Sequence, residues 1–374
     1  MMGPASGARE RLVELALVFA RLGATAFGGP AAHVALMEHE LVERRGWLAR
    51  GEFLDLIGAA NLIPGPNSTE VAMHAGRRRA GAAGLVVAGV CFIVPATLLV
   101  AGCAAAYVRF GRLPATASVL RGVRPVVIAV VVQALWRLGR TALATPALVL
   151  VALVVAALDV AGASPIVLLL TAGGAGALAR IGRPGLAAGL AAAGSAPAAA
   201  AAPAVGLVPL FLVFAKIGSV LFGSGYVLLA FLRADLVERL HWLTETELLD
   251  AVAIGQATPG PVSTAATFVG YLLAGAPGAA VATAGIFLPA FVFVAASGPL
   301  LPRLRRAPAS AGFLDGVNAA ALALMAVVAW QLGRAAIVDL PTAALALASA
   351  VLLVATRVGS AWLVVSGALV GLAL

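Results

Sequence analysis

The sequence has few charged residues for its length. Asp, Glu, Lys and Arg make up 11% of the 374 residues, hydrophobic residues make up 62%, and the mean hydropathy is +1.05. An ordinary soluble domain carries about 25% charged residues, so this composition excludes a soluble globular protein. At about 20 residues per span, the apolar runs predict about 10 to 13 membrane segments. We therefore expect an all-α polytopic membrane protein.

The sequence also lacks the residues of a redox, metal or nucleotide site. The two cysteines, Cys91 and Cys103, would lie about 18 Å apart along a helix, which is beyond disulfide reach. His39-Glu40 lacks the second His of a metalloprotease motif, and no phosphate-binding loop is present. We expect no metal, no cofactor and no ATP hydrolysis. Residues 1–10 lack the apolar core of a cleaved signal peptide, so the first apolar stretch is expected to be a retained helix.

Lysine is almost absent. Lys216 is the only lysine among the 25 basic residues, and the net charge is +9. In a protein with many spans, excess arginine in short cytoplasmic loops sets the orientation in the membrane. The positive charge is therefore interpreted as an orientation signal, and no nucleic-acid partner is expected.

The most informative feature is an internal repeat. Residues 12–69 align without gaps to residues 207–264 with 25 identities over 58 positions, and the match continues after one deletion to Gly139-Arg140 and Gly333-Arg334. A stretch rich in Ala, Gly and Pro separates the two copies. We predict an N-terminal transporter half over 1–184, a linker over 185–204 and a C-terminal transporter half over 205–374.

The positions of the basic clusters favour an inverted repeat. Arg77, Arg78 and Arg79 follow the Pro-Gly-Pro segment of the first half, where the second half has no charge. The second half carries its cluster one span later, at Arg303, Arg305 and Arg306. If both clusters face the cytoplasm, equivalent ends of the halves lie on opposite sides of the membrane. A parallel arrangement stays open, because an inverted repeat would place other arginines of the first half on the outer side of the membrane.

Each half contains a Pro-Gly-Pro segment that predicts a discontinuous helix. Proline removes a backbone donor and disfavours helix at the residue before it, and the half-helix that follows offers free N–H groups to an anion. A single kink could simply adjust packing, but two at matched positions favour a substrate path. The candidate binding residues are Gly65, Asn67, Ser68, Thr69, Gly260, Ser263 and Thr264. The candidate helix-breaking residues are Pro64, Pro66, Pro259, Pro261, Gly28, Gly29, Gly223 and Gly225.

Several ionisable residues lie inside apolar segments. Arg21 and Lys216 occupy equivalent positions in the first helix of each half, where they could neutralise a divalent anion or extend toward the membrane surface. Glu70 and His74 lie one turn apart after the first Pro-Gly-Pro and have no charged counterpart in the second half. With His33, they are candidates for proton coupling, and a structural hydrogen bond is the alternative for each.

Long sequence runs resemble the chromate ion transporter family, in its long two-domain form. They are FGGPAAH (27–33), ELVERRGWL (40–48), NLIPGPNSTE (61–70), HAGRRRAG (74–81), KIGSVLFGSGYVLLAFL (216–232) and AIGQATPGPVSTAATFVGYLLAG (253–275). The resemblance covers effectively the whole chain. Ser263 departs from the family pattern, which has a bulky aromatic residue there, so its role rests on this sequence alone.

The resemblance implies a secondary transporter of the bacterial inner membrane that exports chromate and confers chromate resistance. Chromate and the lipid bilayer are the implied partners, and sulfate, another tetrahedral dianion, is the expected competitor. Short family members work as pairs of half-length chains, so a homodimer stays open.

Two other functions stay open from the residues. A transporter of sulfate or another oxyanion would share every feature described above. An intramembrane enzyme would need a cluster of catalytic groups, and only Glu70 and His74 come close. We therefore expect a transporter and not an enzyme.

Overall fold

The computed structural model describes residues 7–111, 113–182, 205–222, 225–297, 307–356 and 358–373, and these residues contain no strand. The predicted all-α fold is confirmed. The predicted linker 185–204, Gly223 and the cluster Arg303, Arg305 and Arg306 lie outside the described residues. The helices of the first half are α1 (Ala8–Thr25), α2 (Gly29–Glu38), η1 (His39–Arg44), α3 (Arg50–Ala60), α4 (Asn67–Phe110), α5 (Pro114–Ala142), α6 (Pro146–Val160) and α7 (Pro165–Arg180). Those of the second half are α9 (Leu207–Val220), η3 (Gly225–Val227), α10 (Leu228–Leu232), η4 (Arg233–Arg239), α11 (Glu245–Ala257), η5 (Val262–Thr264), α12 (Ala265–Ser297), α14 (Pro308–Ala336), α15 (Leu340–Ala355) and α16 (Ser360–Ala373).

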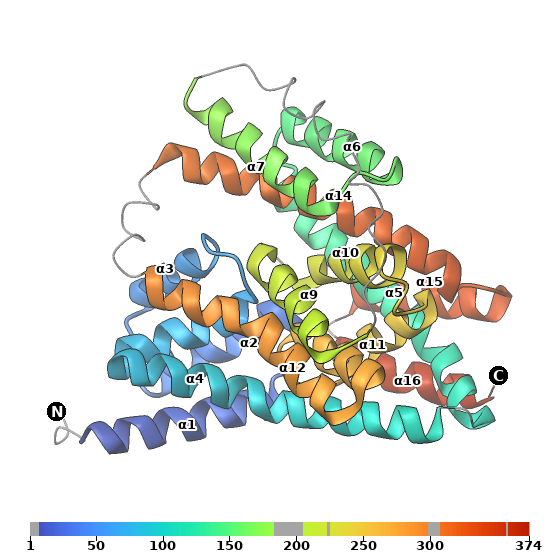
Figure 1. Ribbon diagram of the computed structural model, residues 1–374, viewed down its shortest axis with the longest axis horizontal. Helices are drawn as coiled ribbons and strands as arrows, with labels where there is room; N and C mark the ends of the chain where they lie inside the picture. Colours follow the sequence, from blue (N-terminus) through green and yellow to red (C-terminus); the bar gives the residue numbers. More distant parts are fainter. Residues whose placement is uncertain are drawn as a thin grey trace.

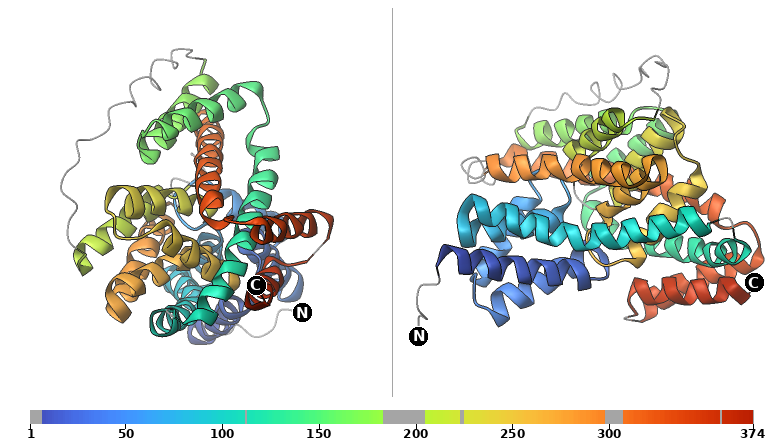
Figure 2. Two further views of the ribbon diagram at one scale, coloured as in Figure 1. Left: turned by 90° about the vertical axis from the view of Figure 1, so that its right-hand side faces the viewer. Right: turned by 60° about the horizontal axis from the view of Figure 1, so that its bottom comes forward.

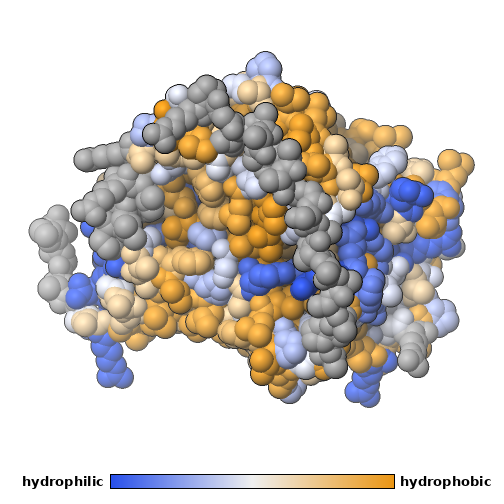
Figure 3. Space-filling model, turned by 45° about the horizontal axis from the view of Figure 1, so that its top comes forward, coloured by the Kyte–Doolittle hydropathy of each residue, from blue (hydrophilic) through white to orange (hydrophobic). Residues whose placement is uncertain are grey.

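Four helical segments in the described part are long and apolar enough to cross a membrane: α4, α5, Val262–Ser297 and α14. Five more apolar helices are shorter, and a 16-residue helix rises only about 24 Å against a hydrocarbon core of about 30 Å. The described residues thus hold fewer full-length spans than hydropathy predicts, because several apolar stretches end after about four turns. Apolar side chains cover broad areas of the surface (Figure 3), as expected of a polytopic membrane protein.

The long helix α4 folds back on itself. Its backbone leaves the helical region at Ala80 (φ −146°, ψ 29°) and Gly81 (φ 64°, ψ −148°). Gly76 and Gly84 would lie about 12 Å apart along a straight helix. Instead they touch, since a Cβ atom on Gly76 would come within 2.2 Å of the Gly84 carbonyl oxygen. The element is therefore a helical hairpin, with a short arm that begins at Asn67 and a long arm that ends at Phe110.

The second half repeats this hairpin. In α12 the backbone turns at Ala274 (φ −147°, ψ 26°) and Gly275 (φ 63°, ψ −154°), and a Cβ atom on Gly270 would come within 2.3 Å of the Gly278 carbonyl oxygen. The short arm follows Pro-Gly-Pro in both halves. The half-helices predicted from the prolines are thus present at matched positions.

The two hairpins lie side by side and point in opposite directions (Figure 1; Figure 2). Arg77, near the turn of α4, donates hydrogen bonds to the carbonyl oxygens of Val294 (2.5 Å) and Ala295 (2.9 Å), near the end of α12. Near the end of α4, the ring of Tyr107 packs edge-on against Phe268 at 5.2 Å, on the short arm of the α12 hairpin. Equivalent segments therefore run antiparallel, and the predicted inverted repeat is confirmed.

The last two helices of each half pack against the other half. Helices α6 and α7 lie along α14, and α15 and α16 lie along α5 (Figure 1). Glycines allow the close approach: a Cβ atom on Gly176 would lie 1.9 Å from the Gly312 carbonyl oxygen, and one on Gly122 would lie 2.0 Å from that of Gly367. Each half thus completes the packing of its partner.

This exchange predicts that neither half folds alone. We expect fragments 1–184 and 205–374 to be degraded when each is produced singly, because α5 and α14 would expose their mutual packing faces. Produced together, they should co-purify through a tag on one fragment and resist limited proteolysis like the intact chain. A single fragment as resistant to protease as the intact chain would contradict the exchanged packing.

Candidate functional site

The Pro-Gly-Pro segment of each half meets the end of the first helix of the other half. The Gly65 N–H donates to the carbonyl oxygen of Leu221 at 2.6 Å, and the Gly260 N–H donates to that of Ala26 at 2.9 Å. The two bonds are equivalent in the repeat. Interrupted helices inside a membrane must satisfy their free backbone groups within the protein or along a polar cavity. Four chain breaks therefore meet at one centre between the halves.

Glycine is required at the centre of both Pro-Gly-Pro segments. Gly65 has φ 152° and Gly260 has φ 96°, a region that residues with a Cβ atom rarely adopt. A Cβ atom on Gly65 would lie 2.9 Å from that of Ala290, and one on Gly260 would lie 2.3 Å from that of Ala96. The backbone of each break thus packs directly against the long arm of the opposite hairpin.

The short arm of α4 buries polar groups that have no partner among the described residues. They are the Thr69 hydroxyl, both carboxyl oxygens of Glu70 and Nε2 of His74. Thr69 and Glu70 are fully buried, and His74 is 6% exposed. A buried polar group without a partner costs about 1–3 kcal/mol. An arrangement that keeps several of them together near a helix start is suited to binding a ligand or a proton.

The second half is more apolar at the equivalent positions. Ser263 and Thr264 are buried, and the Thr264 hydroxyl donates to the Pro261 carbonyl oxygen at 2.8 Å. Ala265 stands where the first half has Glu70. The site is therefore asymmetric, as the sequence indicates, and its ionisable groups belong to the first half.

His33 connects the two breaks of the first half. Its Nε2 lies 3.1 Å from the Ala26 carbonyl oxygen and its Nδ1 lies 3.3 Å from the Ser68 hydroxyl. The imidazole is 1% exposed. These contacts match the structural hydrogen bonds that the sequence left open as the alternative role for His33.

Arg21 and Lys216 each have a carboxylate partner. Arg21 Nη2 lies 2.6 Å from Glu40, and Lys216 Nζ lies 2.5 Å from Asp235. The two ion pairs occupy equivalent positions, and neither cation lines the cavity described below. Anion binding by Arg21 and Lys216 stays a prediction, and an anion would have to displace these carboxylates.

Glu40 is the centre of a larger charge cluster at the end of α2. Burial by itself would raise the pKa of Glu40, but hydrogen bonds from Arg45, Arg44 and Arg21 outweigh it and lower the pKa to about 2. The carboxylate therefore stays ionised across the physiological range. The cluster fixes the surface segment η1 to α1.

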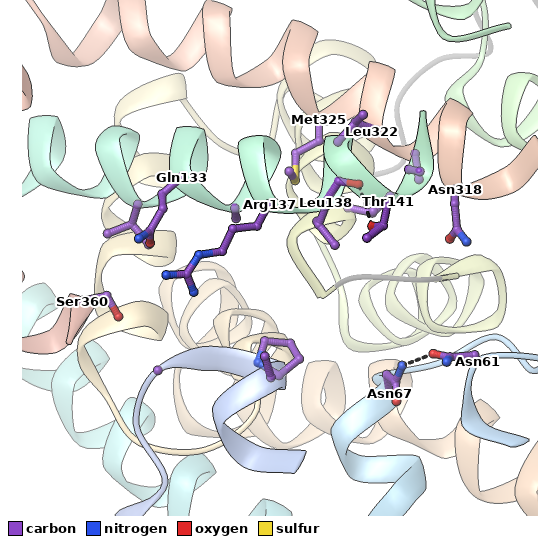
Figure 4. A pocket seen from close by; sticks show the side chains of 18 of the residues that line it. Asn61, Asn67, Gln133, Arg137, Leu138, Thr141, Asn318, Leu322, Met325 and Ser360 are labelled. Carbon is purple, nitrogen blue, oxygen red and sulfur yellow. Dashed lines mark hydrogen bonds between the residues drawn. The ribbon is translucent and has the colours of Figure 1, made fainter. Parts of the chain in front are cut away.

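A cavity of about 940 Å³ opens beside the breaks of the first half (Figure 4). Its walls come from α5, α14, the segment between α15 and α16, and the starts of α2 and α4. Gly28 and Asn67, two of the residues predicted from the sequence, reach it. Its polar lining residues include Asn61, Asn67, Gln133, Arg137, Thr141 and Asn318. The cavity thus connects the surface of the bundle with the first Pro-Gly-Pro segment.

An ion pair with a buried carboxylate joins the halves near the start of α5, away from the cavity. Arg124 binds the carboxylate of Asp250 with two hydrogen bonds of 2.8 and 3.0 Å, and the Tyr107 hydroxyl donates to it at 2.9 Å. Asp250 is fully buried. Arg124 and Arg137 are 13 residues apart on α5, about 20 Å along the helix. The halves are therefore joined by charge at this end of α5 as well as by the Arg180–Asp315 ion pair on the cavity wall.

Sequence reasoning predicted the Pro-Gly-Pro breaks and the asymmetric Glu70 and His74, and the structure brings these together at one centre. Sequence reasoning did not identify Asp250 or Arg137. Asp250 follows Glu245 and Glu247 in α11 and directly precedes an apolar run, and this position is the available signal. Arg137 carries no such signal, because it resembles the orientation-setting arginines around it.

The antiparallel hairpins, the interrupted helices and the polar cavity define a membrane transport protein built from two inverted halves. A family model described as "Chromate transporter" matches residues 13–177 and 208–372. The chain belongs to this family, which consists of transport proteins and not of enzymes.

Curated relatives match most of the chain. The chromate transport protein of Cupriavidus metallidurans is 35% identical over 373 residues, covering 96% of this chain and 92% of its own length. The probable chromate transport protein of Synechococcus elongatus is 31% identical over 347 residues, with 88% and 87% covered. The chromate transport protein of Pseudomonas aeruginosa is 31% identical over 324 residues, with 82% and 77% covered. No solved structure matches the chain.

Proposed function

We propose that this protein is a secondary transporter that exports chromate across the bacterial inner membrane and thereby confers chromate resistance. Its family and the names of its relatives support chromate as the substrate. The observation that carries the mechanism is the reciprocal pair of hydrogen bonds from Gly65 to Leu221 and from Gly260 to Ala26, because it places both half-helix starts at one centre between the inverted halves.

The half-helix starts supply the groups that a dianion needs. Backbone N–H groups at a helix N-terminus point at the ligand, and the helix dipole favours negative charge there. In this proposal the hydroxyl groups of Thr69 and Ser263 donate hydrogen bonds to the oxygens of the anion. Ser68, Thr264 and the amide of Asn67 join them by exchanging their present partners, which are His33, Pro261 and Asn61. Alternating access follows from rocking of one half against the other around this centre.

Glu70 is the proposed coupling residue. Its carboxyl group is fully buried beside the first Pro-Gly-Pro and has no partner in the described part of the chain. Burying an ionised carboxylate without a partner costs several kcal/mol, so in this conformation Glu70 carries a proton. When the halves rock and the cavity opens to the opposite side of the membrane, water reaches the carboxyl group and the proton leaves. The second half has Ala265 at the equivalent position, so the proposed coupling carboxyl group belongs to the first half.

Transport is tested by flux in two systems. Cells that make the protein should accumulate less chromate than matched cells without it. Inside-out membrane vesicles should take up chromate with saturable kinetics. Weak inhibition of this uptake by excess sulfate would support chromate as the substrate. Faster flux of sulfate than of chromate would support the sulfate alternative. Higher accumulation in cells that make the protein would show uptake and contradict export.

The sequence-based role of Lys216 gives a separate prediction. If Lys216 binds the anion, Lys216→Met should raise the KM for chromate by about 10- to 100-fold, since a charge-assisted hydrogen bond contributes roughly 1.5–3 kcal/mol. The double variant with Asp235→Asn, which removes the ion-pair partner as well, should stay equally impaired. Recovery of the wild-type KM in the double variant would limit Lys216 to a structural ion pair.

A further inference from the structure

Arg137 is an exposed arginine on the cavity wall that has no ion-pair partner among the described residues. It lies on α5 and its side chain extends from the helix toward the start of α2 (Figure 4). No carboxylate bonds to it in the described part of the chain, whereas Arg180, which also lines the cavity, is held by Asp315 at 2.9 Å. Among the described residues that line the cavity, Asp315 is the only one with a carboxylate. The charge of Arg137 is therefore free to act on whatever enters.

Helix starts add to this positive field. The starts of α2, α4 and α16 open on the cavity, since Gly28, Asn67 and Ser360 are among its lining residues. Each helix start carries about half a positive charge. With Arg137 unpaired and Asp315 neutralised, the cavity is positive overall and accepts an anion more readily than a cation.

The internal repeat shows that Arg137 has no arginine counterpart in the second half. Arg137 corresponds to Gln331 in the second half, whereas its neighbour Arg140 corresponds to Arg334. An arginine that only set membrane orientation would need no cavity position, and Arg140 does not line the cavity. The free cation is thus specific to the side on which the cavity opens in this conformation.

We propose that Arg137 binds the divalent oxyanion in the cavity before the anion reaches the Pro-Gly-Pro breaks. This inference rests on the proposed transport function and adds a first binding site to it. A guanidinium group donates parallel hydrogen bonds to two oxygens of a tetrahedral anion. Asn67, at the first position of α4 and on the cavity wall, lies on the route from this first site to the breaks.

The test is equilibrium binding of radiolabelled chromate and sulfate to the purified full-length protein, followed by flux in proteoliposomes. Arg137→Gln should raise the Kd for the dianion at least tenfold, and Arg137→Lys should raise it less because the charge remains. Asn318→Asp, which places a carboxylate in the same cavity, should raise the Kd severalfold. The matched control is Arg140→Gln, one turn along α5 and outside the cavity, which should leave the Kd unchanged.

The outcomes separate this inference from the transport function. Wild-type Kd values in both Arg137→Gln and Asn318→Asp would overturn the role of Arg137, even if chromate is transported. Arg137-dependent binding without flux would support the first site and contradict the transport function. If Arg137→Gln does not fold, the Asn318→Asp and Arg137→Lys variants decide, since a Kd unaffected in both overturns the inference.

Discussion

Gly260→Ala is expected to lose a large share of the stability of the protein and all of its transport. The new Cβ atom would lie 2.3 Å from that of Ala96 and 3.1 Å from the Gly23 carbonyl oxygen, at a φ of 96°. The backbone conformation costs about 1–2 kcal/mol for a residue with a side chain, and the overpacking adds about 1–3 kcal/mol. The sum is a large share of a typical folding free energy of about 5–15 kcal/mol. Thermal unfolding in detergent, with chromate flux alongside, measures the effect.

Gly162→Ala is the matched control. Gly162 has a similar φ of 93°, but a Cβ atom there would meet nothing within 4 Å. It should therefore lose only the conformational part, about 1–2 kcal/mol, and keep its flux. Adding Ala96→Gly to Gly260→Ala should restore part of the loss, and a double-mutant cycle gives that coupling directly. Equal destabilisation by Gly162→Ala and Gly260→Ala would mean that the close approach of the break to α4 is absent.

Glu70→Gln is expected to uncouple transport from the proton gradient. The amide cannot release a proton, so accumulation driven by an imposed pH gradient should fall to the level of protein-free liposomes. Exchange of chromate across the membrane at equal pH should continue, because the helix starts and hydroxyl groups remain. Parallel measurements of driven accumulation and of exchange in proteoliposomes give both quantities.

Two further variants make the Glu70 experiment specific. Glu70→Asp keeps an acid at this position and should retain part of the driven accumulation. Glu43→Gln removes an exposed carboxylate that pairs with His39 at the surface and should change nothing. Driven accumulation by Glu70→Gln at the wild-type rate would remove Glu70 from the coupling mechanism.

Much of the fold could be predicted from the sequence because the signals are local. The repeat and the apolar runs predicted two homologous helical halves, the prolines predicted half-helices after each Pro-Gly-Pro, and the basic clusters favoured inversion. The hairpin turns at Ala80-Gly81 and Ala274-Gly275 were not predicted, because each segment contains several glycines and none of them by itself distinguishes a reverse turn from a continuing helix. The exchange of α6 and α7 with α15 and α16 depends on contacts between distant segments, which a single sequence does not show.

The candidate site was predicted in part for the same reason. Glu70 and Gly65 are recognisable from chain position, because each lies beside a helix break. The pairing of Arg21 with Glu40, 19 residues apart, and the placement of Arg137 in a cavity depend on tertiary packing. Charge in an apolar helix therefore identified candidates, but only the folded chain separates paired cations from a free one.

The most direct test of the account is chromate flux through the purified protein in proteoliposomes with an imposed pH gradient. The account predicts saturable chromate accumulation above the equilibrium level, abolished by Gly260→Ala and absent from liposomes without protein. Chromate movement no faster than in protein-free liposomes, with the protein shown to be folded, would contradict it.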